Sequence, residues 1–212
     1  MNNVARSIPG FRYWLVRSID RISWQKWTLW VAAFAVAGCT SLTPAPDSTA
    51  SSNPAQNRCV GTIEPPYGLE QTSNPTLLGR AVGQTDKGGL CEGNVFKVTQ
   101  PLTVYRVWDS SKTWSQYGNW WSFNPPAGPT DTYRAKNEIC PSWSRLDRVT
   151  QCRLKVGSEI VIGPGQSAQC SASDNNISYP PSPATQVFVP NDGAADDDKR
   201  SVTDCLAEIA WP

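Results

Sequence analysis

The stretch Leu102-Thr-Val-Tyr-Arg-Val-Trp108 decides the fold class that we predict for this sequence. Its β-branched and aromatic residues alternate, which is the pattern of a β-strand with one buried face. Arg106 stands inside this aromatic run. It is either a ligand-binding residue or a strand arginine that stacks on Tyr105 or Trp108.

Further strands are predicted on both sides of a helix that follows this stretch. They are residues 118–123, a strand pair at 149–156 and 159–163 joined at Gly157-Ser158, and a last strand at 185–189. The helix spans residues 130–140, where Tyr133, Lys136 and Ile139 are three apart and Pro141 marks the end. These elements predict a small α+β domain with an antiparallel or mixed sheet and few short helices.

Two flanking segments complete this prediction. Residues 59–92 are rich in Gly, Pro, Thr and Asn and are predicted to be a wrapping loop. Ser201 and Asp204 resemble a capping box, which predicts a terminal helix up to Ala210.

The N-terminus has the pattern of an export signal. Residues 1–26 contain five basic residues and one acidic residue, and residues 27–37 are uncharged and mostly apolar. Val36-Ala-Gly-Cys39 resembles a bacterial lipobox, which implies cleavage before Cys39 and acylation (palmitate) of that cysteine. The alternatives are a plain signal peptide and an uncleaved signal anchor. We therefore expect a signal peptide at 1–38, a tether at 39–57 and one domain at 58–212.

Cysteine usage indicates an oxidising compartment. Besides Cys39 the chain has six cysteines, Cys59, Cys91, Cys140, Cys152, Cys170 and Cys205, and an even number in an exported domain predicts up to three disulfides. The sequence does not choose among the fifteen pairings. Our working hypothesis pairs neighbours along the chain, as Cys59–Cys91, Cys140–Cys152 and Cys170–Cys205. Without histidine or a Cys-x-x-Cys pair, no metal site is expected.

Composition excludes several functional classes. With no histidine, the chain cannot build a Ser-His-Asp or Cys-His nucleophilic site. The formal net charge is +1, and removal of residues 1–38 leaves 14 basic against 17 acidic residues, a net charge of −3. Nucleic-acid binders normally carry a basic stripe, so a nucleic-acid partner is not expected.

The order of motifs over about 102–190 resembles the ADP-ribosyltransferase fold. The motifs are Arg106 in its aromatic strand, Trp120-Trp-Ser-Phe123, the run Lys155 to Gly163, and Gln186-Val-Phe-Val-Pro190. Glutamine at the last position is similar to the tuberculosis necrotizing toxin type of NAD glycohydrolase. The resemblance implies that NAD is the substrate and that no cofactor is needed.

The resemblance also implies a role for each motif residue. Arg106 and Gln186 would be catalytic, with the Arg106 guanidinium on the pyrophosphate and the Gln186 amide on the ribose or the attacking water. Ser122, Trp121 and Phe123 would line the nicotinamide pocket together with Trp120. Because neighbouring strand residues point to opposite faces, at least one of the two tryptophans is expected in the core, and Ser122 is then an edge hydroxyl.

Two hypotheses about function remain open at this point. The first is a lipid-anchored, toxin-like enzyme of the cell envelope that cleaves NAD, by hydrolysis or by ADP-ribosyl transfer. An immunity protein or a target protein would be its partner. The second is a non-catalytic, disulfide-linked envelope lipoprotein that binds a protein or ligand through its tryptophan-rich surface.

Overall fold

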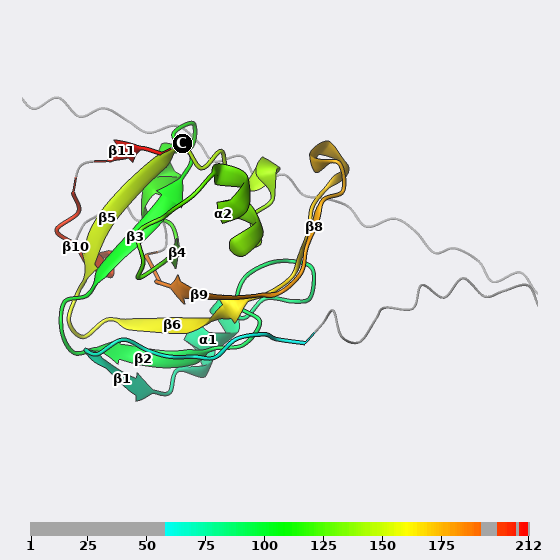
Figure 1. The fold of residues 1–212 in the computed structure, drawn as a ribbon. Coiled ribbons are helices and arrows are strands. Elements are labelled where there is room, and N and C mark those ends of the chain that lie inside the picture. The colour runs from blue at the N-terminus through cyan, green and yellow to red at the C-terminus, as the bar shows by residue number, and fades with distance from the viewer. Residues whose placement is uncertain (1–57, 192–198, 207, 212) are drawn as a thin grey trace, which may run out of the picture. The chain divides into compact units, whose positions relative to one another are not determined.

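Two antiparallel β-sheets form the framework of the computed structural model, which describes residues 58–191, 199–206 and 208–211 (Figure 1). The first sheet has the strand order β1-β2-β6-β9-β4. Its strands are β1 (Leu69–Thr72), β2 (Asn94–Val98), β6 (Glu159–Gly165), β9 (Ser182–Phe188) and β4 (Trp120–Trp121). The described residues thus form a small, mostly antiparallel α+β fold.

The second sheet is built around β5 (Arg148–Leu154). One edge of β5 pairs with β3 (Thr103–Trp108) along its whole length, and the other edge pairs with β10 (Val202–Thr203) and β11 (Ile209–Ala210). The two sheets are joined where Tyr105 and Ser122 exchange backbone hydrogen bonds of 2.8 and 2.9 Å. This bridge sets β3 of the second sheet beside the end of β4 in the first.

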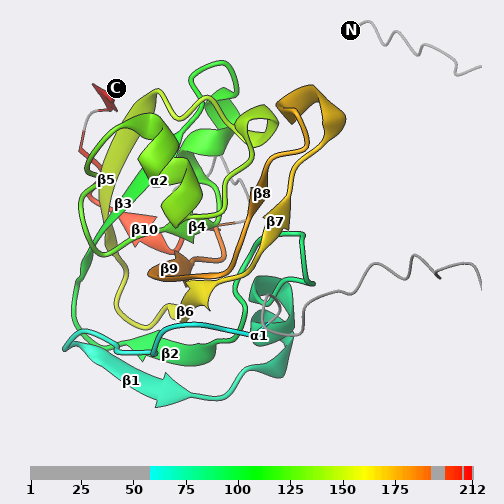
Figure 2. The same ribbon diagram turned by 45° about the vertical axis from the view of Figure 1, so that its right-hand side comes forward.

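Two helices cover the sheets. α1 (Pro75–Ala81) packs Leu77 and Ala81 against Val95, Val161 and Phe188 on the first sheet. It begins at Asn74, whose side chain accepts a hydrogen bond from the Leu77 amide, as an N-cap residue does. α2 (Thr130–Lys136) lies between the second sheet and the paired strands β7 (Ala168–Gln169) and β8 (Ser178–Tyr179) (Figure 2). Three short 3₁₀ helices complete the fold, at Thr113–Tyr117, Pro141–Trp143 and Ala172–Asp174.

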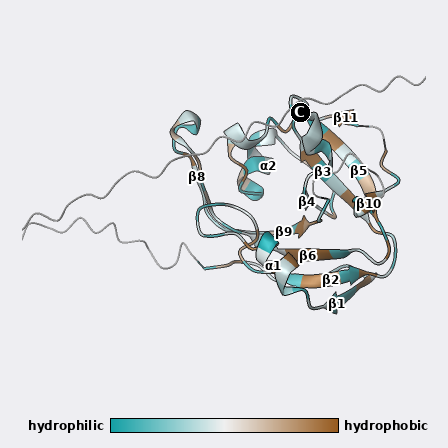
Figure 3. Cartoon of the chain, turned by 180° about the vertical axis from the view of Figure 1, so that it is seen from behind, coloured by the Kyte–Doolittle hydropathy of each residue, from teal (hydrophilic) through white to brown (hydrophobic). Residues whose placement is uncertain are grey.

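The main hydrophobic core lies between the sheets, and Figure 3 shows hydrophobic stretches on β3, β5 and β6. Fully buried residues of both sheets meet there, among them Val104 and Leu154 from one and Ile160, Ile162 and Val187 from the other. Because β6 also packs Val161 against α1, this central strand is buried on both faces.

Three disulfides are present, and only one pairing of our working hypothesis is confirmed. Cys59 is bonded to Cys91, as expected. The other two predicted pairs are wrong, because Cys140 is bonded to Cys170 and Cys152 to Cys205. Cys152 lies in β5, and the pairing of β10 with that strand brings Cys205 beside it, whereas nearness along the chain carried no such information.

Several predicted elements also need correction. The predicted terminal helix is wrong, since Val202 and Ile209 pair with β5 as strand residues, so β9 is not the last strand either. The strands β5 and β6 do not pair with each other; the turn at Gly157-Ser158 carries the chain from one sheet to the other. The predicted loop at 59–92 contains β1 and α1. The predicted helix at 130–140 ends at Lys136.

The predicted signal peptide, the tether and the acylated Cys39 lie outside the described residues. In the part of the chain that the structure describes, neither α-helix is long and apolar enough to cross a membrane.

Candidate functional site

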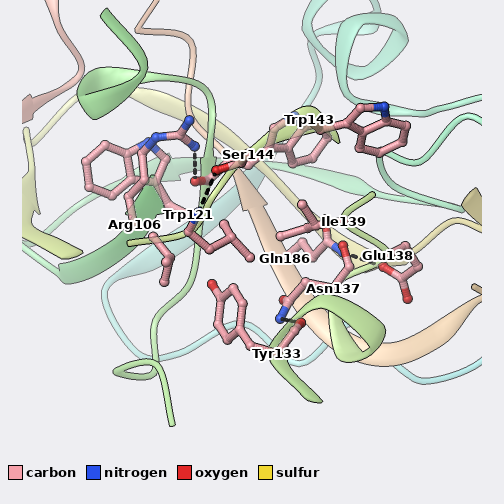
Figure 4. Close-up of a pocket in the computed structure, with 13 residues that line it drawn as sticks. Arg106, Trp121, Tyr133, Asn137, Glu138, Ile139, Trp143, Ser144 and Gln186 are labelled. Carbon is pink, nitrogen blue, oxygen red and sulfur yellow. Dashed lines mark hydrogen bonds between the residues drawn. The ribbon is translucent and has the colours of Figure 1, made fainter. Parts of the chain in front are cut away.

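A pocket opens between β3, β4, β9 and the end of α2, with a volume of about 190 Å³ (Figure 4). Its walls combine charged, amide and aromatic side chains. The polar ones are Arg106, Tyr133, Asn137, Glu138, Ser144 and Gln186, and the larger apolar ones are Trp120, Trp121, Ile139, Trp143 and Leu146. The two residues predicted to be catalytic, Arg106 and Gln186, therefore share one pocket although they come from strands of different sheets.

Arg106 enters the pocket as a partly buried cation. Its Nε donates to the carbonyl of Ser115 at 2.6 Å, and its Nη1 donates to the carbonyl of Trp120 at 2.7 Å. A Cβ atom at Gly118 would collide with the guanidinium, so glycine at this position makes room for it. Burial lowers the pKa of Arg106 to about 10, which leaves the group charged at neutral pH.

No carboxylate of the described residues forms an ion pair with this guanidinium. Among the described residues, the ion pairs involve Lys112, Arg145 and Arg148 but not Arg106, and Nη2 of Arg106 donates to no other described group. A buried charge with only carbonyl acceptors is costly, because a neutral dipole compensates lost hydration less well than a counter-ion does. An anionic ligand in the pocket would supply the missing counter-charge.

Gln186 makes its contacts at the other side of the pocket, with Glu138. Its Nε2 donates to Glu138 Oε2 at 2.7 Å and to the carbonyl oxygen of Asn137 at 3.3 Å. Figure 4 shows Arg106 and Glu138 on opposite sides of the pocket, with Tyr133 and Ile139 between them. The pocket thus carries a cation at one side and a carboxyl–amide pair at the other.

Glu138 is the most unusual residue of the site. Its side chain is only 1% exposed, and Oε1 has no hydrogen-bond partner among the described residues. Burial raises the pKa of its carboxyl to about 7, although the nearby Ser182 and Gln186 groups act to lower it. Its backbone φ of 49° is in the left-handed region, which is uncommon for residues other than Gly, Asn and Asp. Strain of this kind concentrates at functional sites.

The backbone around Glu138 is held from two directions. Cys140, two residues later, is bonded to Cys170, which fixes the segment after α2. On the other side, a Cβ atom at Gly165 would collide with the carboxylate oxygens of Glu138. Glycine at 165 is therefore what allows the carboxyl to pack against the backbone of β6.

Aromatic side chains form much of the remaining wall. Tyr133 packs edge-on against Trp211 with ring centroids 5.0 Å apart, and burial raises the pKa of its phenol to about 12. Its hydroxyl is therefore a neutral hydrogen-bonding group at physiological pH. Trp120 packs edge-on against Phe188 at 5.2 Å, and Trp143 is 45% exposed.

Of the residues predicted to line a nicotinamide pocket, Trp121, Ser122 and Phe123 lie in different places. Trp121 lines the pocket but is a core residue, 4% exposed, whose Nε1 donates to the carbonyl of Gly118. Ser122 and Phe123 are not among the lining residues. The Ser122 hydroxyl accepts a hydrogen bond from the Asn124 amide, and Phe123 packs against the core between the sheets.

No sequence pattern predicts the raised pKa values of Tyr133 and Glu138. Tyr133 belongs to the three-residue spacing that predicts the helix at 130–140, and Glu138 lies within the same predicted helix. Burial of a carboxyl leaves no trace in a single sequence. The one sequence feature near Glu138 is that Cys140-Pro141 follows it closely, because a helix that ends there must turn sharply.

One group of possible metal-ligating atoms occurs among the described residues, at Cys140, Cys170 and Asp174. The two sulfurs are joined in a disulfide and offer no thiolate. Asp174 accepts hydrogen bonds from the amide and hydroxyl of Ser142 at 2.9 and 2.6 Å. These residues therefore serve to hold the segment beside Glu138 in place.

No known protein family matches this chain, and no curated protein or solved structure shows significant similarity to it. The chemistry of the pocket is therefore inferred from its own residues.

Proposed function

We propose that the pocket binds NAD and that the protein cleaves the bond between ribose and nicotinamide, in the manner of the ADP-ribosyltransferase-like toxins that its motifs resemble. The observation that carries this proposal is that Arg106 and Gln186 line the same pocket. Nothing local in the sequence requires two such distant residues to meet. A cation and an acceptor amide in one aromatic pocket match a ligand with phosphates, hydroxyls and a flat ring.

Arg106 is suited to hold the pyrophosphate. Two of its nitrogens are used by the carbonyls of Ser115 and Trp120, which fix the plane of the guanidinium. Its remaining Nη2 is available for a phosphate oxygen, and charge-assisted hydrogen bonds of this type are about twice as strong as neutral ones. Lysine would supply the charge but not the fixed plane.

The chemistry at the ribose needs no strong base. In hydrolysis, the bond from the ribose carbon to the nicotinamide nitrogen breaks, nicotinamide leaves as a neutral molecule, and a water oxygen bonds to the same carbon and releases one proton. The transition state is oxocarbenium-like, so orientation of hydroxyls and nearby negative charge favour it. Gln186 supplies the first, and the Glu138 carboxylate, 2.7 Å from its amide, supplies the second.

The size of the pocket limits which part of the ligand enters. A volume of about 190 Å³ is below the roughly 300–1,000 Å³ typical of sites that enclose a whole drug-sized ligand. We propose that the nicotinamide–ribose end lies inside, beside the half-buried Trp120 and the exposed Trp143. The adenosine end would remain outside the pocket.

The proposal is tested by incubating the purified, oxidised protein with a fluorescent NAD analogue. We expect cleavage, and we expect Arg106→Ala and Gln186→Ala to abolish it with an unchanged circular dichroism spectrum. Arg153→Ala, which removes an exposed arginine from the neighbouring strand, and Ser122→Ala, outside the pocket, should remain active. Absence of turnover by folded, oxidised protein would refute an NAD-cleaving enzyme, and binding without turnover would favour the non-catalytic alternative.

We also propose that the protein is anchored in the cell envelope through a lipid on Cys39. The lipobox-like sequence supports this, and the three disulfides fit an oxidising compartment. Mass spectrometry of the N-terminal peptide from membranes should find an acylated Cys39. Release of the Cys39→Ser variant from the membrane fraction is expected, and equal retention of both forms would contradict the anchor.

A further inference from the structure

The hydrogen bonds of Gln186 determine which of its amide atoms is left for a ligand. Its Nε2 faces two acceptors, the Glu138 carboxylate at 2.7 Å and the Asn137 carbonyl at 3.3 Å. An amide NH₂ has two hydrogens, so these two bonds use its full donor capacity. The opposite orientation would place the amide oxygen against two other oxygens, which is repulsive.

The amide oxygen of Gln186 is therefore the atom that remains. It accepts no hydrogen bond from any described residue, and it is not among the buried polar atoms that lack a partner. Gln186 thus presents an acceptor to the pocket. The complementary ligand group is a hydroxyl or another donor rather than a carbonyl or a phosphate.

Glu138 is the residue that enforces this orientation. Gln186 and Ser182, both of β9, are the polar groups that act on its carboxyl, and Gly165 of β6 packs against it without a side chain. No charged side chain of the described residues is among the groups that influence its ionisation. The ionisation of Glu138 therefore alters the Gln186 amide directly.

We propose that Glu138 is a positioning residue: in its ionised form it holds the Gln186 amide with its oxygen toward the pocket, so that the site selects a ligand hydroxyl. This inference rests on the proposed function only for the identity of that hydroxyl, which would belong to the ribose of NAD. The orientation itself is a property of the protein alone.

The role of Glu138 is coupled to pH with a defined sign. Below its raised pKa the carboxyl is neutral, and the bond from Gln186 loses its charge-assisted character. Above it, the carboxylate attracts the NH₂ group and the amide oxygen is fixed toward the pocket. A change of about one pH unit around neutrality therefore alters how firmly the Gln186 amide oxygen is held toward the pocket.

The test is a pH titration of the side-chain amides by NMR, with the full protein labelled with ¹⁵N at glutamine. Gln186→Met identifies the Gln186 resonance pair by its disappearance. We expect these signals to shift between pH 5 and pH 9 with a midpoint near 7, and to lose that shift in Glu138→Gln. The Gln116 amide, which faces the hydroxyl of Thr150 and no carboxylate, serves as the internal control and should not follow this titration.

The outcomes separate this inference from the proposed function. Gln186 signals that stay unchanged from pH 5 to 9 in the wild-type protein would overturn it, whether or not the variant folds. A titration that persists in folded Glu138→Gln would also overturn it. A protein that shows the Glu138-dependent titration but cleaves no NAD would support the role of Glu138 and refute the enzymatic proposal.

Discussion

Two buried acids, Asp109 and Glu138, show how differently one chemical group is treated in two regions of this molecule. Asp109 is 3% exposed and accepts hydrogen bonds from the amide and hydroxyl of Ser111 and from the amide of Arg145. Lys112 and Arg145 also approach it, at 3.8 and 3.9 Å. Burial would raise the pKa of Asp109, but these hydrogen bonds and Lys112 hold it below its ordinary value.

Glu138 is buried as deeply as Asp109, but its carboxyl accepts fewer hydrogen bonds. It receives a single bond within ordinary hydrogen-bond geometry, from Gln186, and its Oε1 has no partner among the described residues. Burial thus raises the pKa of a carboxyl where few donors compensate for it, as at Glu138, whereas several donors and a nearby cation reverse the shift at Asp109. Asp109 is thus bound into the hydrogen-bond network of the fold, and the functional role belongs to Glu138 in our proposal.

The largest expected effect contrasts matched amide substitutions at the two sites. Asp109→Asn turns one acceptor oxygen into a donor that faces backbone amides, and we expect it to lower the free energy of unfolding by about 3 kcal/mol. Glu138→Gln should change it by less than about 1 kcal/mol at pH 4.5, where the folded protein holds this carboxyl neutral and little of its stabilising contribution has been lost. Urea denaturation of both variants measures the difference. Equal losses in the free energy of unfolding would contradict the contrast between the two sites.

The second prediction concerns the pH dependence of stability. The pKa of Glu138 is about 7 in the folded protein against an ordinary value of 4.5, so its stabilising contribution is full below pH 4.5 and is lost as the pH rises through 7. At 1.36 kcal/mol per pKa unit this loss amounts to roughly 3 kcal/mol. For Asp109, whose pKa is lowered, the stabilisation is instead present above its unfolded pKa and is lost as the pH falls.

Denaturation curves from pH 4.5 to 8 test the predicted loss of stability with rising pH. Relative to the wild-type protein, Glu138→Gln should gain stability as the pH rises. A difference between the two proteins that does not vary with pH would show that Glu138 ionises normally.

A third, smaller effect is expected from the glycine that makes room for Glu138. Gly165→Ala forces the carboxyl away from β6, and we expect a loss of about 2 kcal/mol together with a displaced Gln186 amide signal. Gly79→Ala, at a helical position with open space around it, should instead stabilise the protein by about 0.5 kcal/mol. Thermal unfolding of the two variants gives the comparison, and an unchanged melting temperature for Gly165→Ala would contradict the packing described here.

The sequence pattern predicted individual strands of the two sheets but not which strands pair with each other. The alternation in residues 102–108 predicted β3, and the strands predicted at 149–156 and 159–163, on either side of Gly157-Ser158, correspond to β5 and β6. The partners of these strands were not predictable, because a turn of two residues is compatible both with a hairpin and with a passage between sheets. The helix predicted from Ser201 and Asp204 failed because pairing with β5 and the bond from Cys205 to Cys152 override a local capping pattern.

For the candidate site too, some residues were predicted from the sequence and others were not. The resemblance of the motifs to the ADP-ribosyltransferase fold implied roles for Arg106 and Gln186, and both residues line the pocket. The same resemblance implied roles for Ser122 and Phe123, yet alternation along the strand and the early end of β4 direct them elsewhere. Glu138 was missed because its importance comes from burial, a left-handed backbone and Gly165, all of which are set by distant parts of the chain.

The central claim is that Arg106 and Gln186 act on one ligand in one pocket, and NMR titration with NAD tests it most directly. The signals to follow are the Nε–H of Arg106 and the side-chain amide of Gln186 at pH 7.5, with a non-cleavable NAD analogue where turnover interferes. We expect both signals to shift with the same dissociation constant, and Arg106→Ala to weaken the response at Gln186. Unmoved signals at saturating ligand, or two different dissociation constants, would contradict it.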